Sequence, residues 1–69
     1  RQWRRDVQEL LARLEPREYE IIHYRFGLHH GDAETLEEVG RRMNLTRERV
    51  RQIQQSTMSK LRRMVGENN

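Results

Sequence analysis

The sequence predicts an all-α domain of four helices that ends in a helix-turn-helix, with helices over about residues 2–14, 17–26, 36–43 and 47–65. Two observations predict this fold. Apolar residues recur at helical spacing, with no strand-like alternation, and residues 35–53 have the layout of two helices joined by a tight turn. The 69 residues make one small domain without cysteine, so neither disulfides nor thiolate-bound zinc can stabilise it. Its core is therefore expected to come from helices packed on helices.

The first helix is predicted from an apolar stripe at helical spacing, formed by Trp3, Val7, Leu10, Leu11 and Leu14. Pro16 ends this helix and can occupy the first turn of the next one, where its missing N–H costs little. Gly27 is the stop signal of the second helix. Polar residues and Gly31 then predict a loop over residues 28–34.

The two helices of the helix-turn-helix have recognisable start and stop signals. Thr35 is predicted to cap the third helix in a capping box with Glu38. Asn44 takes the turn because it tolerates left-handed backbone geometry, and Thr46 caps the fourth helix. Gly40 is expected where two helices cross, and residues 66–69 are expected to fray. The core stripe of the fourth helix is Val50, Ile53, Thr57, Leu61 and Met64.

The two halves of the chain differ in charge. Residues 1–34 hold six basic and seven acidic residues, whereas residues 35–69 hold eight basic and four acidic residues. Between Arg41 and Arg63 the only acid is Glu48. A cationic half on a balanced domain is typical of phosphate binding, although a solvated helix surface has the same composition.

Four candidate base-reading residues are expected on the outward face of the first two turns of the fourth helix, and Arg47 is expected to project from its N-terminal tip. Recognition helices contact bases with these N-terminal residues. Arginine can donate a fork to guanine, glutamate can accept from cytosine N4, and glutamine can pair with adenine. Glu48 could also serve only to favour the helix N-terminus through the dipole. The set is Arg47, Glu48, Arg51, Gln52 and Gln55.

The strings Thr35–Gly40 (TLEEVG) and Leu45–Ile53 (LTRERVRQI) resemble region 4 of primary-type bacterial sigma factors, and Tyr24–Leu28 (YRFGL) resembles the segment before it. The resemblance covers about residues 10–63. It implies recognition of the −35 promoter element, with Arg47, Glu48 and Gln52 reading bases in the major groove. It also places near the DNA backbone Arg17, Arg25, Thr35, Leu36, Glu37, Arg49 and Arg51. Leu36 and Glu37 could offer main-chain N–H groups at a helix N-terminus, while Arg17 and Arg25 could instead pair with nearby glutamates.

The resemblance implies a second surface as well, which binds the flap-tip helix of the RNA polymerase β subunit. The second helix carries apolar residues on two faces, so part of it is either core or offered to a partner. The candidate partner residues are Leu10, Leu11, Leu14, Ile21, Tyr24 and Leu28. On this interpretation residues 1–34 are the partner-binding helices and residues 35–65 the helix-turn-helix of a region 4 domain over residues 1–69. The chain, which begins with Arg1, is expected to be a fragment of a longer protein.

One departure concerns the last helix. Sigma factors often carry basic residues at two positions of this helix where activators dock. This chain has Ser56 and Ser59 there, although Lys60, Arg62 and Arg63 nearby are basic. The family pattern for activator contact is therefore incomplete in this patch.

Other classes of function have weaker support. His23, His29, His30 and Asp32 lack a recognised metal-ligand spacing, and the chain has no nucleophile–base pair and no phosphate-binding loop. We expect no enzyme activity, no metal and no cofactor.

The remaining alternatives are a module bound mainly by an anti-sigma factor or another transcription regulator, and a helix-turn-helix regulator outside the sigma family. The expected partners are double-stranded promoter DNA and the polymerase core, with anti-sigma factors or activators as further candidates. No apolar run is long enough to span a membrane. The expected location is the bacterial cytoplasm, on the nucleoid through polymerase.

Overall fold

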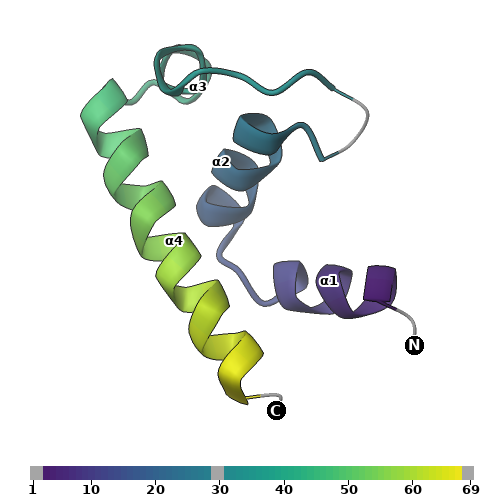
Figure 1. The fold of residues 1–69 in the computed structure, drawn as a ribbon. Helices are drawn as coiled ribbons and strands as arrows, with labels where there is room; N and C mark the ends of the chain where they lie inside the picture. The colour runs from purple at the N-terminus through teal and green to yellow at the C-terminus, as the bar shows by residue number, and fades with distance from the viewer. Residues whose placement is uncertain (1–2, 29–30, 68–69) are drawn as a thin grey trace.

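The computed structural model describes residues 3–28 and 31–67, and this part of the chain folds into four helices without strands (Figure 1). The helices are α1 (Trp3–Ala12), α2 (Pro16–Phe26), α3 (Leu36–Met43) and α4 (Arg47–Glu67). The long α4 contacts all three other helices, and α3 and α1 lie toward its opposite ends. The predicted all-α fold is confirmed. The predicted first residue of α1, Gln2, lies outside the described residues, as does the side chain of Trp3.

The end of α1 corrects the sequence prediction, because the helix stops at Ala12 and not at Leu14. The N–H groups of Arg13 and Leu14 donate to carbonyl groups three residues back, each at 3.1 Å, which is a tightened final turn. Pro16 disfavours helical geometry in the residue before it, and Glu15 is extended with φ −63° and ψ 150°. Leu14 nevertheless remains buried.

Both ends of α2 are fixed by local contacts. Pro16 is the first helical residue, one position earlier than predicted, and the N–H of Glu15 donates to Glu18 Oε1 at 2.9 Å. Gly27 ends the helix in the left-handed region, with φ 61°. A Cβ atom at Gly27 would also collide with the carbonyl oxygen of Gly31. Glycine is therefore needed here both for its backbone angle and for its lack of a side chain.

The predicted caps of α3 are confirmed. Thr35 Oγ1 accepts from the N–H of Glu38 at 3.1 Å, and Glu38 Oε1 accepts from the N–H of Thr35 at 2.8 Å. Asn44 ends the helix with φ 58°. Gly40 is buried, and it lies against the turn that follows α3. A Cβ atom at Gly40 would lie 2.6 Å from the carbonyl oxygen of Leu45. The small residue thus lets the turn fold back against α3.

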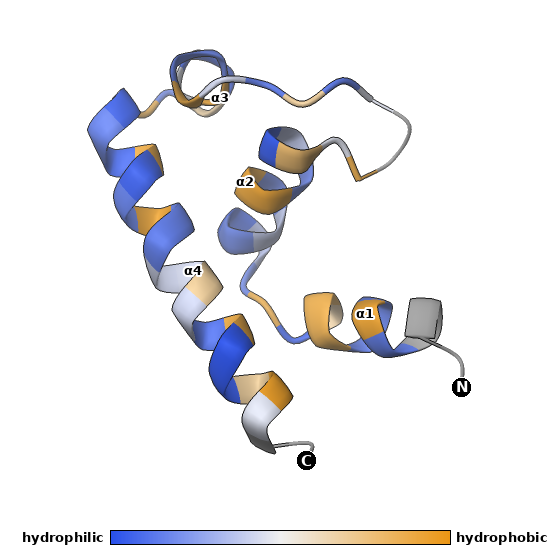
Figure 2. Ribbon diagram, in the orientation of Figure 1, coloured by the Kyte–Doolittle hydropathy of each residue, from blue (hydrophilic) through white to orange (hydrophobic). Residues whose placement is uncertain are grey.

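The core lies where α2, α3 and α4 meet (Figure 2). Its buried members are Ile21, Val39, Val50 and Ile53, and Tyr24, Leu36, Met43 and Leu45 pack against them. The predicted inner stripe of α4 is confirmed at Val50, Ile53, Thr57 and Met64, which are buried, while Leu61 is half-buried. The buried hydroxyl of Thr57 donates to the carbonyl of Ile53 at 2.7 Å, so it is satisfied within its own helix.

The C-terminal end of α4 also differs from the prediction. The helix continues through Gly66 to Glu67, although residues from 66 onward were expected to fray. Met64 lies 5% exposed near this end, and α1 packs against the same helix. Packing of one face therefore outweighs the poor helix propensity of a single glycine.

Candidate nucleic-acid interface

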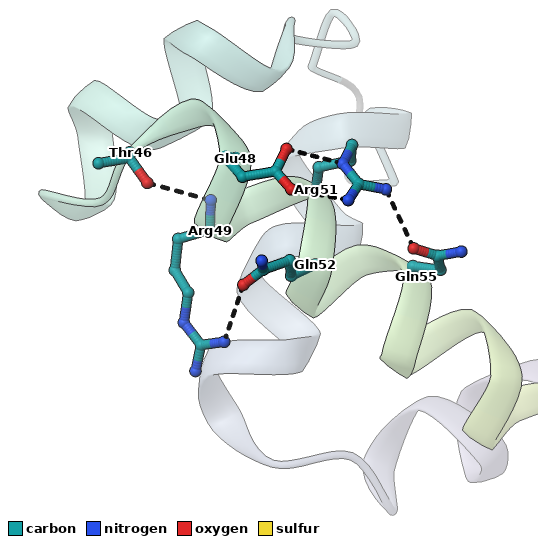
Figure 3. A network of polar contacts seen from close by, with 6 residues as sticks. All are labelled: Thr46, Glu48, Arg49, Arg51, Gln52 and Gln55. Atoms are coloured by element: carbon teal, nitrogen blue, oxygen red, sulfur yellow. Dashed lines mark hydrogen bonds and ion pairs between the residues drawn. The ribbon is translucent and has the colours of Figure 1, made fainter.

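The turn between α3 and α4 determines where the exposed helix starts. The N–H of Leu45 donates to the carbonyl of Gly40 at 2.8 Å, which closes the turn after Asn44. Thr46 Oγ1 then accepts from the N–H of Arg49 at 3.0 Å (Figure 3). This is an N-cap contact, so α4 begins at Arg47 and its first turns carry the candidate base-reading residues.

All five candidate base-reading residues are exposed on α4: Arg47, Glu48, Arg51, Gln52 and Gln55. The sequence predicts four of them on one outward face and Arg47 at the N-terminal tip. Figure 3 shows Glu48, Arg51 and Gln55 joined in one network, with Gln52 beside them. This face is largely hydrophilic in Figure 2, in contrast to the apolar stripe that packs on α2.

Arg51 lies at the centre of this network. Its Nε donates to Glu48 Oε1 at 2.9 Å and its second terminal nitrogen donates to Glu48 Oε2 at 2.7 Å. Its other terminal nitrogen donates to Gln55 Oε1 at 3.1 Å. The pairing with Glu48 is bidentate, which is the strongest geometry for an arginine and a carboxylate.

The protonation of both partners follows from this contact. The hydrogen bond and the charge of Arg51 hold the pKa of Glu48 below its ordinary value, and Glu48 in turn raises the pKa of Arg51. Glu48 is therefore an ionised acceptor at neutral pH. An ionised carboxylate can only accept hydrogen bonds, which suits it to a base-edge amino group.

The remaining contacts on this face are looser. Arg49, a candidate for the DNA backbone, donates to Gln52 Oε1 at 3.5 Å (Figure 3), a distance at the weak limit of a hydrogen bond. Arg47 is exposed at the very start of α4. These side chains can therefore reorient at little cost.

The start of α3 offers a second polar feature. Leu36 and Glu37 form the first turn after the Thr35 cap, where the main-chain N–H groups have no partner within the helix. The side chain of Leu36 packs on the core, while Thr35 and Glu37 are exposed. This geometry is compatible with the predicted phosphate contact through main-chain groups.

The structure gives Arg25 a structural role that the sequence did not predict. Its Nε donates to Gln54 Oε1 at 2.9 Å and a terminal nitrogen donates to the carbonyl of Glu34 at 2.6 Å. Its guanidinium also lies 5.7 Å from the centre of the Phe26 ring. The half-buried Arg25 thus links α2 to α4 and to the loop before α3, whereas the other helix-2 candidate, Arg17, is exposed.

Two further charged contacts were missed by the sequence reasoning. Arg42 forms a bidentate ion pair with Glu34 and lies 4.4 Å from the centre of the Tyr24 ring. Lys60 Nζ lies 3.0 Å from Glu18 Oε1. Glu18 and Lys60 are 42 positions apart, so no local pattern in the sequence could have indicated this pair.

The candidate partner residues separate into core and surface. Ile21 is 0% exposed and Leu14 is 8% exposed. Ile21 therefore has no surface to offer a partner, and the structure assigns it to the core. Tyr24 is half-buried against the core, Leu10 and Leu11 are half-buried on α1, and Leu28 is 42% exposed. The predicted set did not include Phe26, a large apolar residue two positions before Leu28 that is 47% exposed.

Ser56 is exposed on α4, and Ser59 Oγ accepts from Arg62 at 3.1 Å.

Within residues 3–28 and 31–67 no group of three or more acidic or histidine residues could hold a metal ion. His29 and His30 lie outside the described residues. In the same part of the chain, no helix is long and apolar enough to cross a membrane.

A short capped helix, a left-handed turn and a long helix with an exposed polar face define the class of this protein: it is a helix-turn-helix domain. The particular family follows from comparison with known proteins. Residues 10–63 match the family described as Sigma-70, region 4. The chain belongs to this family, which is a DNA-binding family of transcription initiation and not a known class of enzyme.

Three relatives illustrate the similarity. The chain is 54% identical over 57 residues to the "Probable RNA polymerase sigma-C factor" of Synechocystis sp., which covers 83% of this chain and 14% of the relative. It is 50% identical over 56 residues to RNA polymerase sigma factor SigA4 of Synechococcus elongatus, with 81% of this chain and 18% of the relative covered.

The third relative is RNA polymerase sigma factor SigA of Clostridium acetobutylicum, 47% identical over 62 residues, with 90% of this chain and 16% of the relative covered. The chain spans less than a fifth of the length of these relatives.

Proposed function

We propose that this chain recognises the −35 element of promoter DNA as the DNA-reading domain of an RNA polymerase sigma factor. One observation carries the proposal: the first turns of α4 present five exposed side chains of types that can bond base edges, in a chain that belongs to the Sigma-70 region 4 family. The relatives are named as RNA polymerase sigma factors, which supports the same role for the parent of this chain.

In this proposal α4 enters the major groove with its N-terminal end first, as recognition helices do. Arg47, Glu48 and Gln52 contact base edges, with Glu48 accepting from a cytosine N4 amino group and Arg47 donating to guanine. The turn and the Thr46 cap support this orientation because they leave Arg47, Glu48 and Arg49, the first three residues of α4, exposed.

Contacts to the DNA backbone would orient the domain on the duplex. Arg49 and Arg17 are exposed, and the main-chain N–H groups of Leu36 and Glu37 face no partner within α3. Such contacts supply affinity and register but carry no sequence information. Arg25 is left out of this set because its donors are held by Gln54 and Glu34.

The same chain would bind the flap tip of the polymerase β subunit through α1 and the end of α2. The exposed apolar side chains Phe26 and Leu28 support this part of the proposal, together with the half-buried Leu10 and Leu11 of α1. Exposed apolar groups are typical of a surface that receives a partner helix. The place of action would be the bacterial cytoplasm, on the nucleoid through polymerase.

The DNA-binding proposal is tested by fluorescence anisotropy with a labelled duplex that carries a TTGACA-like element, a scrambled duplex, and a series with single base-pair substitutions. We expect tighter binding to the TTGACA-like duplex. Glu48→Ala should reduce the preference at one or two base pairs, whereas Arg17→Ala should weaken all duplexes alike and lower the salt slope of binding by about 1.

The outcomes separate the candidate functions. Equal binding to the TTGACA-like and scrambled duplexes would contradict −35 recognition. A flap-tip peptide that binds the chain tightly while DNA binding stays non-specific would favour the alternative of a protein-interaction module. Leu28→Asp should weaken peptide binding and leave base preference unchanged, with Arg17→Ala as the control that affects only DNA.

A further inference from the structure

We propose that Arg51 is a positioning residue that holds the carboxylate of Glu48 for base reading, so that the Glu48–Arg51 pair and not Glu48 alone sets the base preference. The inference rests on the proposed function, because it concerns how the same face reads DNA. It differs from the role of Arg51 as a direct contact to a base or to the DNA backbone.

The geometry of the pair supports this role. Nε and one terminal nitrogen of Arg51 hold both oxygens of Glu48, at 2.9 and 2.7 Å. A carboxylate with two fixed oxygens has a defined plane, which a single hydrogen bond would not impose. Gln55 accepts from the third nitrogen at 3.1 Å, so the guanidinium is itself held from the opposite side (Figure 3).

The pair still has capacity to bind a base. An ionised carboxylate has about four acceptor sites, and Arg51 occupies one on each oxygen of Glu48. The side chains remain accessible, with 49% of Arg51 and 61% of Glu48 exposed. A cytosine amino group can therefore donate to Glu48 while the bidentate contact persists.

Charge gives a second argument. Glu48 is the only acidic residue between Arg41 and Arg63, and a carboxylate that enters a groove lined by phosphates is repelled by them. The positive charge of Arg51 at 2.7 Å offsets this repulsion. Arg51 thus reduces the repulsion between Glu48 and the DNA phosphates, in addition to orienting the carboxylate.

Arg62 provides a matched comparison toward the other end of the same helix, outside the proposed DNA contacts. It is exposed and contacts Ser59 through a single bond of 3.1 Å. Arginine and lysine carry the same charge, but only arginine can form the bidentate fork. Replacing each arginine by lysine therefore separates positioning from charge.

The test measures binding of the chain to the TTGACA-like duplex and to its single base-pair variants for Glu48→Ala, Arg51→Lys, the double variant and the control Arg62→Lys. Glu48→Ala should reduce discrimination at one base pair by about fivefold to 100-fold. Arg51→Lys should reduce discrimination at the same base pair, with an unchanged salt slope. The double variant should lose no more than Glu48→Ala alone, and Arg62→Lys should retain the wild-type preference.

The fold of each variant is checked by circular dichroism, and Gln55→Ala provides a second, milder perturbation of Arg51 that should act on the same base pair. Full discrimination by Arg51→Lys, or a uniform loss on every duplex, would overturn the positioning role while the proposed function stands. A double variant with additive losses would also overturn it. If Glu48→Ala kept the wild-type preference, the base-reading assignment of Glu48 and this inference would fail together.

Discussion

The apolar side chains of the helix-turn-helix are more deeply buried than those of α1. In the helix-turn-helix, Val39 and Val50 are 0% exposed, and both helices have hydrogen-bonded caps. In α1, Leu10 and Leu11 are only half-buried, and the first buried leucine, Leu14, comes after the helix has ended. The shape of the helix-turn-helix therefore depends on a buried core that it shares with α2, whereas the leucine side chains of α1 remain partly exposed.

The largest expected difference between the two regions comes from truncating an apolar side chain in each. Ile53→Ala in the core cluster should destabilise the domain by about 2–5 kcal/mol, because it removes buried methylene groups and leaves a cavity. Leu11→Ala on α1 should cost about 1 kcal/mol, because that side chain is only half-buried. Urea unfolding followed by circular dichroism measures both, and equal losses would contradict the comparison.

A pair of glycines in helices sharpens the comparison at the level of the backbone. Gly40→Ala should destabilise by about 1–3 kcal/mol, because its Cβ atom would lie 2.6 Å from the Leu45 carbonyl oxygen. Gly66→Ala has open space around its Cβ atom and should stabilise α4 by up to about 1 kcal/mol. Thermal unfolding of the two variants compares them, and a neutral Gly40→Ala would show that the turn can move away from α3.

The caps of the helix-turn-helix give a smaller effect. Thr35→Ala removes the hydroxyl that accepts from Glu38 N–H and should cost about 1 kcal/mol. Thr35→Ser keeps the hydroxyl and should remain close to the wild type. Urea midpoints distinguish the two, and a loss in both variants would attribute the effect to the methyl group and not to the cap.

The smallest expected effect is a pH dependence from the same cap. The N–H and the hydroxyl of Thr35 lower the pKa of Glu38 in the folded domain. A lowered folded-state pKa gives stability that is present above the unfolded-state pKa and is lost as the pH falls through the folded-state value, so the loss begins below about pH 4. Glu38→Gln should flatten this part of the stability curve, and an unchanged slope would contradict the assignment.

Local signals in the sequence predicted most of the fold. Thr35, Asn44 and Gly27 act through their own backbone or a residue three positions away, and the structure has all three in the predicted roles. The inner stripe of α4 was predictable because burial follows helical periodicity. The end of α1 was not, because it depends on how Pro16 constrains Glu15 and on where Leu14 packs.

The position of the candidate site was predictable from helical periodicity, but its side-chain contacts were not. The exposed face of α4 follows from periodicity, and all five predicted residues are exposed on this helix. The state of those residues does not follow, because pairing of Arg51 with Glu48 and Gln55 depends on rotamers. The contact of Arg25 with Gln54 spans 29 positions, so the choice between phosphate and protein required the packed structure.

The continuity of α4 has a mechanical consequence. Its 21 residues make an unbroken rod of roughly 30 Å, with the base-reading candidates on its first turns and the packing with α1 toward its other end. An α-helix without a proline bends only gently. A rotation of α4 at the end that packs with α1 therefore also rotates its N-terminal end. Under the proposed function, the angle at which the polymerase holds α1 would therefore set the angle at which the first turns of α4 meet the DNA.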